Sequence, residues 1–91
     1  PSMRQALMML NGKVTHEAAR VGPFEPMHRL LVGKNKNLAK AIDLAYLEIL
    51  TRKPSDEERA EAKAVLGQAP LDGMSDLRWA LLNSHEFRYL P

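Results

Sequence analysis

The chain contains no cysteine, which excludes disulfides, thiolate zinc sites, cysteine-attached haem and cysteine nucleophiles from its 91 residues. No apolar run approaches the ~20 residues that a membrane-spanning helix needs, so we expect no membrane span. A glycine-rich phosphate loop is also missing, because the five glycines are scattered and stand where helices are expected to stop. These absences predict a domain that binds no cofactor.

Neither sign of charge dominates. Thirteen basic and eleven acidic residues leave a net charge of +2, too close to balance to indicate a nucleic-acid or membrane partner. The hydrophobic fraction of 45% and the charged fraction of 26% are typical of an ordinary globular domain. At this length, residues 1–91 make one helical domain with a modest core. The chain begins Pro1-Ser2 without a signal peptide, so we expect a piece of a longer protein.

Apolar residues recur at helical spacing, and no stretch alternates cleanly enough for a strand. The clearest helix is predicted over residues 38–52, and its additional apolar positions Leu44 and Leu47 indicate that it is covered on more than one side. Its main apolar face is formed by Leu38, Ala41, Ile42, Ala45, Tyr46, Ile49 and Leu50.

Capping residues set the other predicted boundaries. Ser2 with Gln5, and Ser55 with Glu58, match the capping box that starts a helix. Short helices are expected over residues 3–10, 15–21 and 26–32, a longer one from 56 to about 66–68, and another from 74 or 75 to 83. Ser84 would then cap one last turn. The fold class predicted is therefore all-α, a compact bundle of about five or six helices.

Two His-Glu pairs, His16-Glu17 and His85-Glu86, invite a zinc-protease interpretation. That chemistry needs a second histidine three residues after the glutamate, and neither pair has one. A metal site would have to assemble from His16, His28 and His85 across three segments, which their spacing does not demand. We therefore predict no metal site, and for the second pair we favour a structural role at a helix end.

His16, Glu17 and Arg20 remain the candidates for a contribution to catalysis. Glu17 also has simpler explanations: it follows an expected helix start, where its charge is favourable, and it lies within reach of Arg4 or Arg20. Serine and threonine hydroxyls are few and stand at helix starts, where capping explains them.

Two other features suggest binding surfaces. Lys34, Lys36 and Lys40 are candidates for contacting a polyanion, together with Arg52 and Lys53, although no aromatic residues interleave with them. Trp79 would lie on a different helix face from Leu77 and Leu81, from which it could dock another part of the parent protein.

Two stretches of the sequence, taken in their order along the chain, are similar to the sequences of a known family. Arg4 to Gly12 with His16 to Arg20 forms the first stretch, and Tyr46 to Ala62 with Asp76 to Phe87 forms the second. Together they resemble the C-terminal part of a planctomycete-specific domain of unknown function. The more specific elements are Leu50 to Glu58 and Leu81 to Phe87; the N-terminal stretch departs more from the family pattern.

This resemblance implies a planctomycete source and a large exported parent protein, often with a cytochrome-c-like domain upstream. It implies a periplasmic or extracellular location and the parent's other domains as partners, and it supplies no catalytic residues. Three hypotheses of function follow. The first is a non-catalytic structural or interaction module; the second is a contribution to a hydrolytic or redox active site completed by other domains; the third is a polyanion- or nucleic-acid-binding module.

Overall fold

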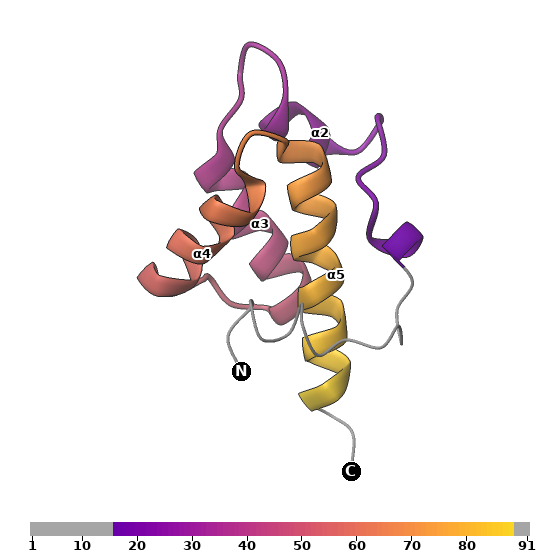
Figure 1. The fold of residues 1–91 in the computed structure, drawn as a ribbon, viewed down its shortest axis with the longest axis vertical. Coiled ribbons are helices and arrows are strands. Elements are labelled where there is room, and N and C mark those ends of the chain that lie inside the picture. Colours follow the sequence, from indigo (N-terminus) through magenta and orange to yellow (C-terminus); the bar gives the residue numbers. More distant parts are fainter. Residues whose placement is uncertain (1–15, 89–91) are drawn as a thin grey trace.

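The computed structural model in Figure 1 describes residues 16–88 of the chain, and side chains from residue 17 to residue 84. These residues form one 3-10 helix, η1 (His16–Ala19), and four α-helices, with no strand among them. The α-helices are α2 (Pro26–Leu31), α3 (Leu38–Leu50), α4 (Asp56–Leu66) and α5 (Pro70–Arg88). The predicted all-α class is therefore confirmed. Five or six helices were predicted, and the first of them, over residues 3–10, lies outside the described residues.

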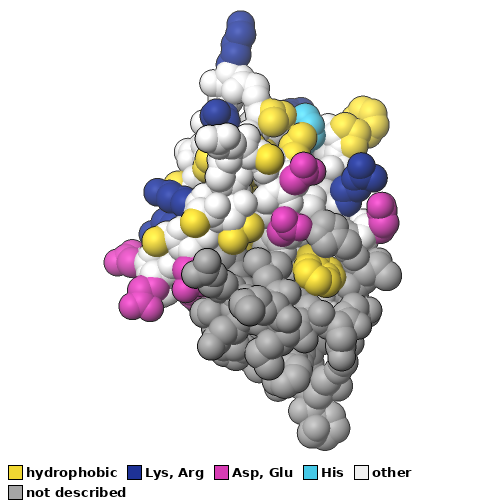
Figure 2. All heavy atoms as spheres, viewed as in Figure 1, with side chains coloured by type: hydrophobic (Ala, Val, Ile, Leu, Met, Phe, Trp, Pro, Cys, Tyr) yellow, Lys and Arg dark blue, Asp and Glu magenta, His cyan; other side chains and the backbone are white. Residues whose placement is uncertain are grey.

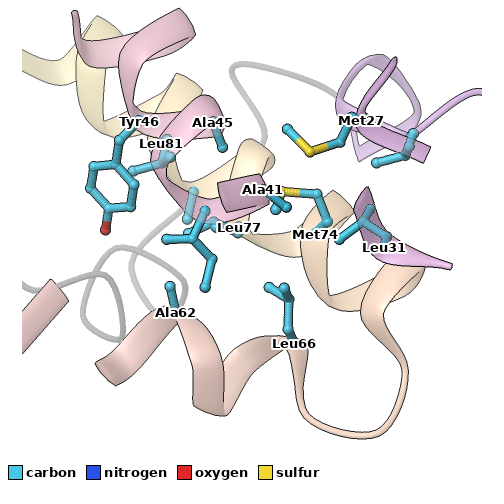
Figure 3. Packing of buried hydrophobic residues seen from close by; sticks show 13 residues of the cluster. Met27, Leu31, Ala41, Ala45, Tyr46, Ala62, Leu66, Met74, Leu77 and Leu81 are labelled. Atoms are coloured by element: carbon cyan, nitrogen blue, oxygen red, sulfur yellow. The ribbon is translucent and has the colours of Figure 1, made fainter. Parts of the chain in front are cut away.

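Helix α5 organises the domain, because it packs against every other described helix, while α3 also packs against α2 and α4. The core lies between these helices (Figure 3), with Met27, Leu31 and Met74 at one end and Tyr46 and Leu81 at the other. The predicted inward face of α3 is largely confirmed, since Ala41, Ile42, Ala45 and Tyr46 are buried. Of the two additional apolar positions, Leu44 is partly buried against the core, whereas Leu47 is 42% exposed.

The start of α3 uses a cap that the sequence analysis missed. The side chain of Asn37 accepts a hydrogen bond of 3.0 Å from the backbone N–H of Lys40. The helix ends at Leu50 because Thr51 adopts the left-handed conformation with φ of 58°. Asparagine directly before an apolar period is a recognised start signal, so the cap could have been predicted from the sequence.

Two predictions for α5 were wrong. The helix begins at Pro70 and not at residue 74 or 75, because proline is tolerated in the first helical turn. It also runs through Asn83 and Ser84 to Arg88 without a break. Ser84 is therefore not an N-cap, and His85 and Glu86 lie within the last turns of α5. The Asn83 side chain, which is buried, donates a hydrogen bond of 2.8 Å to the Trp79 carbonyl one turn earlier.

Candidate functional site

The connection from α3 to α4 holds the strongest polar cluster in the described chain. Ser55 caps α4 by accepting from the Glu58 N–H at 3.2 Å, and the Glu58 carboxylate accepts from the Ser55 N–H at 2.9 Å. The predicted capping box is thus confirmed. Arg52 adds two parallel hydrogen bonds to the same carboxylate, at 2.7 and 2.8 Å. Such bidentate pairs are stronger and more directional than single ion pairs.

Arg52 also lies over the ring of the buried Tyr46, with its guanidinium carbon 5.8 Å from the ring centroid. This distance fits a cation–π contact. Burial is the main cause that raises the pKa of Tyr46 to about 12, so its hydroxyl stays neutral at physiological pH. Arg52, one of the polyanion candidates, is therefore engaged in linking α3 to α4.

The Glu58 carboxyl has the most strongly shifted acid pKa of the described residues. Hydrogen bonds from Arg52, aided by those from Ser55, lower its pKa from 4.5 to about 2. A folded-state pKa below the unfolded value means that Glu58 adds stability above pH 4.5, and that this contribution is lost as the pH falls towards 2. A shift of this size corresponds to about 3 kcal/mol before screening, which we reduce to about 1–2 kcal/mol because the pair is partly exposed.

Glu58→Gln is therefore expected to lower the free energy of unfolding at pH 7 by about 1–2 kcal/mol. The difference from the wild-type protein should narrow below pH 4.5 and vanish near pH 2. Urea unfolding across this pH range measures it. Glu57→Gln, in the same first turn but exposed, is the control and should change stability by only a few tenths of a kcal/mol. Equal, pH-independent losses in both variants would contradict the assignment.

Two further ion pairs link segments that are distant in sequence. Arg59 of α4 contacts Asp43 of α3 at 2.9 Å, and both side chains are about one-third exposed or less. Arg78 of α5 contacts Glu25, the residue before α2, at 2.8 Å. The Gly22 N–H donates to the other oxygen of Glu25 at 2.6 Å, and this bond is the main cause that lowers the pKa of Glu25. These charged residues hold secondary-structure elements together.

The catalytic candidates are placed differently. Glu17 and Arg20 lie on and just after η1 and pair with each other at 3.6 Å, with side chains 82% and 73% exposed. A pair so open to water lacks the sheltered, cleft-like setting that is typical of catalytic groups. Of the two partners predicted for Glu17, Arg20 is observed, and Arg4 lies outside the described residues, as do the caps Ser2 and Gln5. Of His16 and His85 only the backbone is described.

Of the metal candidates, only His28 has a described side chain, and the polyanion candidates fall into two groups, before and after most of α3. Among the described side chains, residues 17–84, no three His, Asp or Glu lie close enough together to hold a metal ion. Lys34 and Lys36 are exposed in the loop between α2 and α3, and Lys40 is exposed in the first turn of α3. Trp79 is half-buried on α5, whereas Leu77 and Leu81 are buried, so its predicted placement on a different face holds.

In comparisons with known proteins, the chain matches no family model, no curated protein and no solved structure. Among the described helices, none combines the length and the apolar character needed to cross a membrane.

Proposed function

We propose that this chain is a non-catalytic helical module of a larger exported bacterial protein, and that it acts by binding that protein's other domains. The supporting observation concerns the two elements that most resemble the planctomycete domain. In the first, Arg52, Ser55 and Glu58 join α3 to α4 through the capping box and the bidentate pair. In the second, Leu81 and Asn83 are buried on α5.

Arg52, Ser55, Glu58, Leu81 and Asn83, which belong to the more specific elements of the resemblance, thus have folding roles. A module needs such residues because a domain of this size has a small core and little stability to spare. An enzyme of the same family would need reactive groups gathered in one cleft as well. The exposed Glu17–Arg20 pair lacks that setting. The periplasmic or extracellular location and the planctomycete source are parts of this proposal.

Thermal unfolding of the remainder of the parent protein, with and without this chain added in excess, tests the proposal. Binding to the folded state stabilises a protein by mass action, so we expect its melting temperature to rise by several degrees with saturating chain. The control is the same addition of chain that has been heat-unfolded. An unchanged melting temperature, together with separate elution of the two components, would refute the proposed function.

A further inference from the structure

Phe24 is the most exposed large hydrophobic residue of the described chain, with 98% of its surface open to water. The whole chain has only five aromatic residues, two of which are phenylalanines. Phe24 therefore leaves one of these few aromatic side chains almost fully exposed to water. Burying a phenylalanine side chain is strongly favourable, and the domain alone does not gain this free energy here. A partner that covered Phe24 would gain it.

The turn that carries Phe24 is held in place from several sides. Within the turn, the Glu25 N–H donates to the Gly22 carbonyl at 3.2 Å, and the Glu25 carboxylate accepts from the Gly22 N–H. Proline at position 23 suits the second residue of such a turn. Phe24 therefore projects from a closed turn and not from a loose loop.

Helix α5 anchors the same turn at two positions one helical turn apart. Ser75 accepts a hydrogen bond of 3.3 Å from the backbone N–H of Val21, and Arg78 donates one of 2.8 Å to Glu25. Ser75 is buried, and the Arg78 and Glu25 side chains are 19% and 38% exposed, so the first anchor is shielded from water and the second partly so. Binding through a preorganised turn avoids most of the entropy that ordering a flexible loop would cost.

Positive charge follows this turn along the chain. Residues 26–42 include four basic residues and no acidic one. Arg29, Lys34 and Lys36 are exposed, and no carboxylate of the described residues pairs with them. Because α2 is six residues long, it separates the Phe24 turn from the lysine loop by only about 9 Å of helix. Figure 1 shows both segments in the upper part of the molecule, and Figure 2 shows a Lys or Arg side chain at its top and protruding hydrophobic ones at the upper right.

We propose that Phe24, Arg29, Lys34 and Lys36, which we call the Phe24 surface, bind an apolar pocket rimmed by carboxylates on another domain of the parent protein. This inference rests on the proposed function and specifies the surface and the partner's chemistry. The ring supplies the buried anchor, because interface energy concentrates in a few desolvated aromatic residues. The cations supply orientation and faster association with an acidic surface.

A protein pocket explains the arrangement better than an anionic membrane does. A lipid surface adapts to the group that enters it, so it gains little from a turn fixed by four hydrogen bonds. A single phenyl ring and a few cations also make a weak membrane anchor, since stable anchoring takes larger apolar area or a second signal. A shaped pocket, in contrast, requires the ring to be held in one position.

Isothermal titration of the full chain with the remainder of the parent protein tests this surface. Phe24→Ala should weaken binding by at least about 30-fold, the loss expected for an interface hot spot, and should leave the melting temperature of the chain unchanged. The double variant Lys34→Glu/Lys36→Glu should weaken binding by at least about 10-fold at low salt and by less at high salt. Leu47→Ala and Lys53→Glu, at exposed positions outside the Phe24 surface, are matched controls that should bind as the wild type does.

The outcomes separate the two proposals. If the wild-type chain binds and Phe24→Ala changes the dissociation constant by less than threefold, the Phe24 surface is overturned while the proposed function stands. No wild-type binding would overturn both. A parallel titration uses phosphatidylcholine vesicles that contain about 30% phosphatidylglycerol as the anionic lipid. Phe24-dependent binding to these vesicles would assign the surface to a membrane and overturn the protein pocket, whereas its absence supports the pocket.

Discussion

Gly73→Ala is expected to lower the free energy of unfolding by about 3 kcal/mol, the upper end of the usual cost of overpacking. An added Cβ at this position would lie 2.5 Å from the Leu66 Cα and 2.6 Å from the Val65 carbonyl oxygen. Both contacts are with backbone at the end of α4, so no side-chain rotation relieves them. Helix α5 would have to move away from α4.

The direction of the change in the free energy of unfolding distinguishes two explanations. Gly73 lies inside α5, and in an ordinary helix interior a change from glycine to alanine stabilises by roughly 0.5–1 kcal/mol. Chemical denaturation therefore distinguishes a close helix contact from simple helix propensity. Gly22→Ala is the control, because its Cβ would meet only the flexible side chain of Glu25, at 3.4 Å. A Gly73→Ala protein as stable as the wild type would refute the close packing of α4 and α5.

Leu77→Ala is expected to lower the free energy of unfolding by about 3 kcal/mol, within the 2–5 kcal/mol range for buried leucines. Leu77 is fully buried at the middle of the core, where α5 meets α3 and α4 (Figure 3). Leu47→Ala makes the same chemical change at a partly exposed site and should cost less than about 1 kcal/mol. Urea unfolding of both variants checks the difference, and equal losses would contradict the assigned core.

Prediction from the sequence succeeded where local signals decide the structure. Helix α3 follows its apolar spacing closely, and the start of α4 follows from the Ser55–Glu58 capping box. Both depend on contacts within a few residues, so the pattern alone carries the information. The missed Asn37 cap belongs to the same class and was available to the same reasoning.

The errors in α5 arose because its sequence signals conflict with its packing. Pro70 and Gly73 were interpreted as parts of a connection, yet proline fits the first turn of the helix. Gly73 is needed where α5 approaches the backbone of α4, a fact of tertiary structure that no local pattern contains. The proposed break at Ser84 relied on a capping residue type that also occurs inside helices.

The candidate surface depended even more on tertiary contacts. The sequence identified Phe24 only as one of five aromatic residues. Its exposure and its fixed turn follow from hydrogen bonds to Ser75 and Arg78, which lie more than 50 residues away in the chain. Arg52 was likewise a candidate for contacting a polyanion, whereas the structure pairs it with Glu58. Ion pairs between elements, such as Arg59–Asp43 and Arg78–Glu25, depend on the packing of helices and cannot be inferred from spacing.

The central claim is that the chain binds other domains of its parent through one defined surface. Amide chemical-shift mapping of the isotope-labelled chain, upon addition of the unlabelled remainder of the parent protein, tests it most directly. The account predicts that the largest shift changes fall on residues 22–37, which include the Phe24 turn, α2 and the lysine loop. Changes centred on Glu17 and Arg20, or on α4, would contradict it.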